Sequence, residues 1–79
     1  MSYRVTAMTP TQCKMARTGL GLRAADLAAR CNLTRETVAR FERGDKMADA
    51  SVEAMQKALA DAGADFSRRA GRVGVTVPE

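Results

Sequence analysis

The chain has 79 residues and a formal net charge of +4, and this length favours a single small domain with one hydrophobic core. It contains no His, and no apolar run approaches the about 20 residues that a membrane-spanning helix needs. We find no signal-peptide pattern, Gly-rich phosphate loop or cluster of metal-ligating residues, so we expect a cytoplasmic protein that is not an enzyme and needs no cofactor or metal.

The basic residues are unevenly distributed. Residues 4–46 hold nine Lys and Arg against four Asp and Glu, whereas residues 47–67 hold one base against four acids. Residues 68–79 are basic again, with three bases and one acid. This distribution favours a polyanionic partner for the first part of the chain. The alternative is an ordinary solvated surface rich in arginine.

The N-terminal residues 1–8 are expected to form an arm or a short strand. Residues 3–7 alternate apolar and polar side chains, which is typical of a strand, and a loosely held terminus fits almost as well. A helix is predicted to begin directly afterwards and to run to about Thr18. Thr9 suits the N-cap, Pro10 the first helical position and Gln12 a capping box.

The centre of the chain predicts two helices joined by a tight turn. Helical spacing covers about residues 24–30 and again residues 35–43, and Asn32, Leu33 and Thr34 stand between them. Asn32 tolerates the left-handed backbone that ends a helix, and Thr34 can cap the next one. Arg23 is a poor cap for the first of the two. The pattern therefore predicts a helix-turn-helix, whose apolar residues on one core are Leu27, Ala28, Cys31, Val38 and Phe41.

A fourth helix and a change of period complete the chain. The helix is expected to begin near Asp49 or Ser51, either of which can cap it, and to end at Gly63. Its inner face consists of Val52, Met55, Ala58, Leu59 and Ala62. Residues 64–67 and 73–77 predict a β-hairpin around a turn at residues 68–71. We divide the chain into an arm (1–8), a helix-turn-helix domain (9–63) and a hairpin tail (64–79).

The two cysteines, Cys13 and Cys31, lie on predicted apolar faces. We interpret them as reduced thiols packed as small hydrophobic groups, in preference to a disulfide. The fold class expected from all these elements is mainly α: a small four-helix domain with a C-terminal β-hairpin or strand.

With the helices in place, residues 9–66 resemble the phage-repressor/Cro type of helix-turn-helix, also called the xenobiotic-response-element family. The resemblance depends on Leu27-Ala28, Leu33-Thr34, Thr37-Val38 and residues 41–44 (FERG), all at family spacing. It implies that Arg17 and Glu42 form a partly buried ion pair, and that Thr34, Arg35, Glu36 and Arg40 face the major groove. Two departures are Arg23 and Ala24, where the family often has Ser and Gln.

The chemistry of these side chains suggests individual roles at the interface. Arg35 and Arg40 can each present two donors to guanine. Glu36 either accepts from cytosine or is a favourable charge in the first turn of its helix. Thr37 suits a phosphate or a thymine methyl group. Phosphate contacts are expected from Arg23, Arg43 and Lys46, whose alternative is a solvated surface.

We therefore predict a sequence-specific regulator of transcription, of the repressor kind, that binds double-stranded DNA as a homodimer in the nucleoid. The expected dimerisation residues are Phe66, Val73, Val75 and Val77 in the tail; the outer part of the fourth helix is the alternative interface. The competing hypothesis is an antitoxin or accessory module whose tail binds a toxin or RNA polymerase, with DNA binding secondary.

Overall fold

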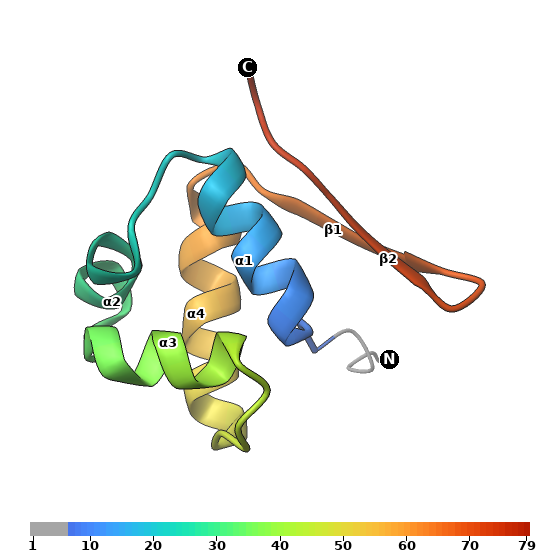
Figure 1. Cartoon of the computed structure of the whole chain (residues 1–79). Coiled ribbons are helices and arrows are strands. Elements are labelled where there is room, and N and C mark those ends of the chain that lie inside the picture. Colours follow the sequence, from blue (N-terminus) through green and yellow to red (C-terminus); the bar gives the residue numbers. More distant parts are fainter. Residues whose placement is uncertain (1–6) are drawn as a thin grey trace.

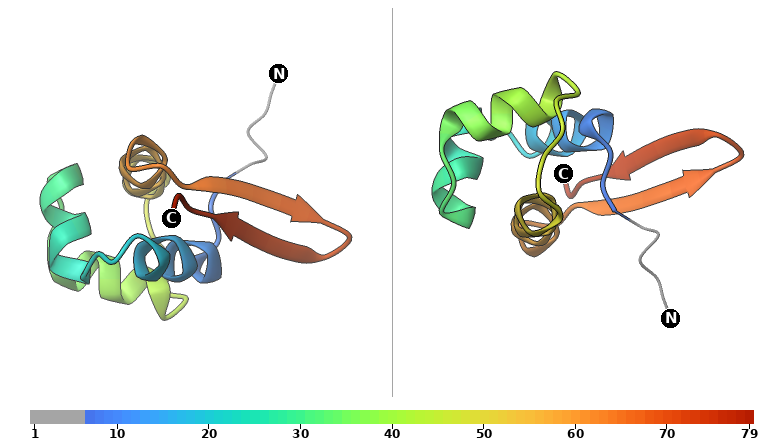
Figure 2. Two further views of the ribbon diagram at one scale, coloured as in Figure 1. Left: turned by 90° about the horizontal axis from the view of Figure 1, so that it is seen from above. Right: turned by 90° about the horizontal axis from the view of Figure 1, so that it is seen from below.

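The computed structural model describes residues 7–79 (Figure 1). Four helices, α1 (Pro10–Gly19), α2 (Ala24–Cys31), α3 (Arg35–Glu42) and α4 (Asp49–Asp61), precede the strands β1 (Asp65–Arg69) and β2 (Arg72–Thr76). The helices pack around one core, and the hairpin projects from them on the side opposite α2 (Figures 1 and 2). This mainly helical domain with a C-terminal hairpin confirms the predicted fold class.

Helix α1 begins as the sequence predicts. The Thr9 hydroxyl accepts from the Gln12 backbone N–H at 3.1 Å, and the Gln12 side-chain oxygen accepts from the Thr9 backbone N–H at 3.1 Å. Pro10 occupies the first helical position. The capping box thus satisfies two of the N–H groups that a helix start leaves without an intrahelical partner.

The start of α4 differs from the prediction. Its N-cap is Ala48, which has no side-chain oxygen, so the expected cap at Asp49 or Ser51 is wrong. Ala48 already has the extended backbone of an N-cap, with ψ of 141°, and its carbonyl oxygen accepts from the Ser51 N–H at 3.0 Å. Asp49 therefore lies in the first turn, where its negative charge interacts favourably with the positive end of the helix dipole.

The core takes side chains from every helix. Leu27, Val38, Met55 and Leu59 have no exposed surface, as the helical spacing predicts. The remaining buried apolar residues are Met8, Cys13, Ala16, Ala28, Phe41 and Ala64. Burial of such side chains contributes roughly 1.5–3 kcal/mol for each large one. The helices are consequently held by a core of aliphatic and sulfur-containing groups in which Phe41 is the one buried aromatic ring among residues 7–79.

The hairpin is antiparallel, and its turn consists of Ala70 and Gly71 alone. Both have positive φ, 49° and 77°, as in the two-residue turns that match the twist of a hairpin. The strands therefore extend to Arg69 and Arg72, and the turn is shorter than the predicted residues 68–71.

The hairpin is attached to the helices at its base. The Gln12 amide Nε2 donates to the carbonyl oxygens of Ser67 (2.9 Å) and Gly74 (3.2 Å), one on each strand. Phe66 and Val75 pack against the core beside them. A buried glutamine that holds both strands explains why a two-stranded sheet, which is marginal alone, is ordered here.

Two further predictions concern the arm and the cysteines. Residues 3–6 of the expected N-terminal strand lie outside the described residues, and Ala7 is exposed and in no strand. Cys13 and Cys31 are both free thiols, and Cys13 is fully buried, as predicted for small hydrophobic groups.

Candidate nucleic-acid interface

The turn between α2 and α3 has the geometry that the sequence predicts. Asn32 adopts the left-handed conformation, with φ of 62° and ψ of 37°, and caps the end of α2. Leu33 N–H then bonds to the Ala28 carbonyl at 2.9 Å. The Thr34 hydroxyl accepts from the Thr37 N–H at 3.1 Å and caps α3. These three residues thus change the direction of the chain between the two helices and fix where α3 starts.

Helix α3 has two different faces. Val38 and Phe41 are buried in the core, with 0% and 6% of their surfaces exposed. At about 100° per residue, the side chains on the opposite side span an arc of about 140°. They are Arg35, Glu36, Ala39, Arg40 and Arg43, and all but the half-buried Ala39 are exposed. The outer face is consequently polar, predominantly basic and supported by an apolar base.

The charged groups on this outer face are held only weakly by their neighbours. Arg40 Nε lies 3.8 Å from Glu36 Oε2, and Arg43 Nη2 lies 3.8 Å from Asp45 Oδ2, with all four side chains more than half exposed. Within residues 7–79, Arg35 takes part in no ion pair. Exposed pairs of this kind contribute about 0–1 kcal/mol, so these guanidinium groups can be rearranged around a ligand at little cost.

Arg23, at the start of α2, is also exposed but is better organised. Its backbone N–H donates to Asp26 Oδ2 at 2.8 Å, and its guanidinium lies 3.2 Å from the same carboxylate. Arg23 cannot accept from the helix, so Asp26 provides half of a capping box from inside it. The Arg23 guanidinium holds the pKa of the Asp26 carboxyl below its ordinary value.

A different kind of ion pair fixes α3 to α1. Arg17 Nε donates to Glu42 Oε2 at 2.8 Å and Arg17 Nη2 to Glu42 Oε1 at 2.9 Å, and the two side chains are only 16% and 9% exposed. Arg17 Nη1 also donates to the Leu22 carbonyl at 3.0 Å. This two-pronged pair ties α1, the α1–α2 loop and the end of α3 together, and it is the ion pair that the family resemblance implies.

Cys13 contacts the Arg17–Glu42 pair, and we call these three side chains the junction between α1 and α3. Its Sγ donates to Glu42 Oε2 at 3.4 Å. Burial, together with the nearby Glu42 charge, raises the pKa of the Cys13 thiol from 9.0 to about 12. The hydrogen bond to Glu42 likewise raises the pKa of Arg17 above its ordinary value. The junction therefore holds a charged arginine and a neutral thiol around one carboxylate.

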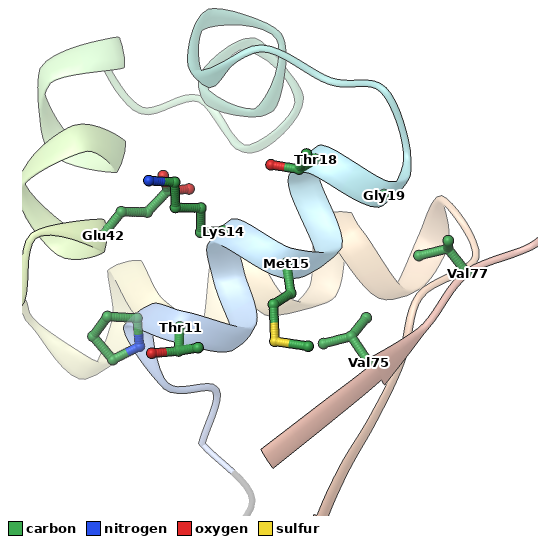
Figure 3. A pocket seen from close by; sticks show the side chains of 9 residues that line it. Thr11, Lys14, Met15, Thr18, Gly19, Glu42, Val75 and Val77 are labelled. Carbon is green, nitrogen blue, oxygen red and sulfur yellow. The ribbon is translucent and has the colours of Figure 1, made fainter. Parts of the chain in front are cut away.

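An apolar groove of about 620 Å³ lies along the outer side of α1 (Figure 3). Met15 from α1 and the valines Val75 and Val77 from the tail line it, and Lys14 and Glu42 stand at its other side. Met15 is 41% exposed and is the one large apolar side chain among residues 7–79 with that much exposure. Val75 and Val77 also pack against the core, so only part of their surface lines the groove.

The predicted interface residues fall into two separate groups. One group surrounds α3: Thr34 at its start, Arg35, Glu36, Thr37 and Arg40 within it, and Arg43 and Lys46 after it. Arg23 lies at the start of the neighbouring α2. The other group, the tail residues Phe66, Val73, Val75 and Val77, lies on the hairpin side of the molecule and is in part used by the chain's own core.

Two supporting residues have roles that the sequence analysis did not anticipate. Gln12 was expected to cap α1, but its amide also holds the hairpin. Asp26, which the sequence pattern does not single out, accepts from the Arg23 backbone N–H at the start of α2. An acidic residue at the third helical position was a usable signal for Asp26. The second role of Gln12 had no signal, because its partners lie 55 and 62 residues away in the sequence.

The comparisons with known proteins agree with this geometry. A family model described as helix-turn-helix matches residues 14–62, a span that includes most of α1 and all of α2, α3 and α4. No curated protein matches the chain. No helix among residues 7–79 is long and apolar enough to cross a membrane. The chain belongs to the helix-turn-helix family of the Cro/C1 type, whose members are DNA-binding regulators of transcription.

Proposed function

We propose that this protein is a sequence-specific repressor that places α3 in the major groove of its operator. The supporting observation is the contrast between the two faces of α3. Val38 and Phe41 are buried, whereas Arg35 and Arg40 are exposed. Arg40 is paired only weakly, with Glu36, and Arg35 forms no ion pair among residues 7–79. A helix of this kind, entering through a capped turn from α2, matches the groove-reading helix of helix-turn-helix proteins.

Sequence readout is assigned to the start and middle of α3. Arg35 and Arg40 each offer two parallel donors to the O6 and N7 atoms of guanine, worth about 1–3 kcal/mol of discrimination for each well-placed pair. Glu36, which now approaches Arg40, can accept from a cytosine amine once Arg40 turns to a base. The Thr34 and Thr37 hydroxyls lie 2.8 Å apart, so one donates to the other and the accepting hydroxyl keeps its own proton to donate to a phosphate oxygen.

We assign the positioning of the protein along the duplex to basic side chains around α3. Arg23 precedes α2, Arg43 ends α3 and Lys46 lies in the α3–α4 connector, and all three are exposed. Contacts from such side chains to phosphates position the protein without reading bases. Together with Thr34 they surround α3, as expected for residues that contact the two sugar–phosphate strands bordering the groove.

One copy offers only about three to five phosphate contacts, so we propose that two copies bind a palindromic site with half-sites about one helical turn apart. The hairpin tail is the proposed dimerisation element. Because Phe66, Val75 and Val77 pack against the chain's own core, the exposed residues and edges of the hairpin provide much of the contact.

Selection of duplexes from a random library at about 150 mM salt tests the proposal, since specific sites must outcompete salt-sensitive non-specific binding there. The wild-type chain should enrich a palindromic motif. An Arg35→Ala/Arg40→Ala variant should lose that enrichment while its thermal unfolding stays close to that of the wild type. Lys57→Ala, on the exposed side of α4 and paired with Asp61, is the matched control.

Failure to enrich any motif, or equal weak binding by the wild type and the double variant, would overturn sequence readout by α3. In that case the competing function, a module that binds a protein through the hairpin and the groove beside Met15, becomes the better account. It predicts a stoichiometric protein partner whose binding is unaffected by Arg35→Ala/Arg40→Ala.

A further inference from the structure

The tip of the hairpin carries a cationic pair that the DNA interface does not use. Arg69 and Arg72 are the last and first residues of β1 and β2 and stand directly opposite each other. Side chains paired in this way share a face of the sheet with Cβ atoms about 4.5–5.5 Å apart, and like charges so placed destabilise the pair. Both are exposed, and among residues 7–79 neither forms an ion pair.

The hairpin (residues 65–76) forms a second arm, distinct from the N-terminal arm (residues 1–8), and carries the arginine pair at its tip. The base of the hairpin is held by Gln12 and by Phe66 in the core, and Arg68, on the other face of the strands, donates to the Ala7 carbonyl at 3.3 Å. The arm projects from the helices on the side opposite α2 (Figure 2). A duplex lying against α2 would therefore be on the far side of the molecule from the hairpin.

An anionic pair of matching spacing lies on the exposed side of α4. Asp49 and Glu53 are one helical turn apart, exposed, and in no ion pair within the described part of the chain. Residues spaced in this way have Cβ atoms about 5–6 Å apart, close to the spacing of the arginine pair. The other acid on this side, Asp61, is already held by Lys57 at 3.0 Å.

The arm cannot reach the α4 of its own chain at these positions. Strand β1 leaves the C-terminal end of α4 and extends sideways from the helix, and its five residues carry the tip about 16 Å from there (Figure 1). Glu53 lies eight residues before Asp61, about 12 Å back along the helix, and Asp49 lies one turn further. The two pairs can therefore meet only between molecules.

We propose that a second copy of this chain is the partner of the arm: Arg69 and Arg72 of each copy bind Asp49 and Glu53 of the other. Two such contacts are related by a two-fold axis, as a closed dimer requires. The inference rests on the dimer of the proposed function and gives it a specific interface. Exposed ion pairs are individually weak, so their role is to orient the two copies, and the dimer should weaken as salt rises.

Charge reversal tests the arrangement. The arm-reversed variant is Arg69→Glu/Arg72→Glu, and the α4-reversed variant is Asp49→Arg/Glu53→Arg. Each alone brings like charges together at both contacts and should weaken dimerisation about tenfold or more. An equimolar mixture of the two should form heterodimers, and one chain with all four substitutions should form homodimers again. Sedimentation equilibrium at low salt measures all of these states.

The controls separate this interface from folding and from DNA reading. The control variant Lys14→Glu/Arg30→Glu lowers the net charge as much as the arm-reversed variant does, but at residues outside the proposed contact. It should dimerise like the wild type. The arm-reversed variant should unfold at about the wild-type temperature, since both substituted side chains are exposed. Asp49→Arg places a positive charge in the first turn of α4 and Arg30→Glu a negative charge in the last turn of α2, so the variants that carry them should unfold at a slightly lower temperature. A duplex containing one half-site, too short for a second copy, should bind the arm-reversed variant as it binds the wild type.

Several results would overturn the proposal. They are a wild type that stays monomeric both free and on its palindromic site, reversed variants that dimerise normally, or a mixture that forms no heterodimer. Normal dimerisation of the arm-reversed variant with reduced affinity for the half-site would instead assign the arginine pair to phosphates. None of these results bears on α3, whose role is tested separately by Arg35→Ala/Arg40→Ala.

Discussion

Helix α3 carries ion pairs at two places, and they differ in almost every physical respect. At its junction with α1, Arg17 and Glu42 are joined by two hydrogen bonds of 2.8 and 2.9 Å and are mostly buried. On its outer face, Glu36 and Arg40 lie 3.8 Å apart and are 69% and 58% exposed. The same helix thus uses one pair to be held in place and leaves the other available to a ligand.

The difference shows how residues of the same type can be sorted into structural and recognition roles. Removing one partner of a buried pair leaves a desolvated charge, whereas an exposed charge that loses its neighbour is simply solvated. Substitutions at the junction should therefore change stability, and substitutions on the outer face should change DNA binding. Three experiments test this separation, and a fourth tests the connector that follows α3.

The largest effect is expected at the junction. Glu42→Gln should destabilise the fold by about 3–5 kcal/mol, because Arg17 is left without its counter-charge. Urea unfolding followed by circular dichroism measures this. Replacing both partners, Arg17→Met/Glu42→Leu, should recover most of the loss, since no charge is then buried alone. A single variant within about 1 kcal/mol of the wild type would contradict a structural role for the pair.

Substitution on the outer face should weaken DNA binding and leave the free energy of unfolding nearly unchanged. Arg40→Ala should reduce binding to the selected operator by about 1–3 kcal/mol and relax preference at one base pair. The free energy of unfolding should change by no more than about 0.5 kcal/mol. Fluorescence anisotropy on operators with each base substituted, together with urea unfolding, gives both numbers. Equal weakening on every sequence would assign Arg40 to a phosphate.

The stability of the fold at alkaline pH is a further test of the junction, because the junction contains the buried Cys13 thiol. Its pKa in the folded state, about 12, lies above 9.0, so the folded chain keeps a proton that the unfolded chain releases. This contribution to stability is complete below about pH 9 and is lost as pH rises toward 12, by about 1 kcal/mol at pH 10. Cys13→Ala should lose this part of the pH dependence. An identical alkaline loss in both proteins would show that other groups cause it.

The smallest effect concerns the connector that follows the outer face. Ala48 caps α4 without a side-chain acceptor, so Ala48→Ser should stabilise the fold by about 1 kcal/mol. Ala50→Ser, two residues later in the first turn, is the matched control and should not stabilise. Thermal unfolding of both variants measures the difference. Equal effects would mean that the N-cap of α4 is not at Ala48.

Much of the fold follows from local sequence signals. The Thr9 capping box, the left-handed Asn32 and the Thr34 cap depend on residues within a few positions of one another, and all three appear in the structure. The cap of α4 was misplaced because Asp49 and Ser51 are both good caps in isolation. The connector that precedes them sets the start of the helix at Ala48.

The interactions that required the structure are those between distant segments. Gln12 bonds to Ser67 and Gly74, and Cys13 bonds to Glu42, across separations that no local pattern records. The expected dimerisation residues show the same limit. A valine every second residue predicts a strand but does not say whether the chain's own core or a partner covers it, and here the core covers part of Val75 and Val77.

The central claim is that the outer face of α3 binds DNA while the junction and the hairpin do not. Backbone amide chemical shifts, recorded by NMR as a duplex with one half-site is added, test it directly, because only one copy can bind this duplex. The largest changes should fall on residues 34–46 and on Arg23, with small changes on the hairpin tip and beside Met15. Largest changes on the hairpin or in the groove along α1, with α3 unaffected, would contradict the claim.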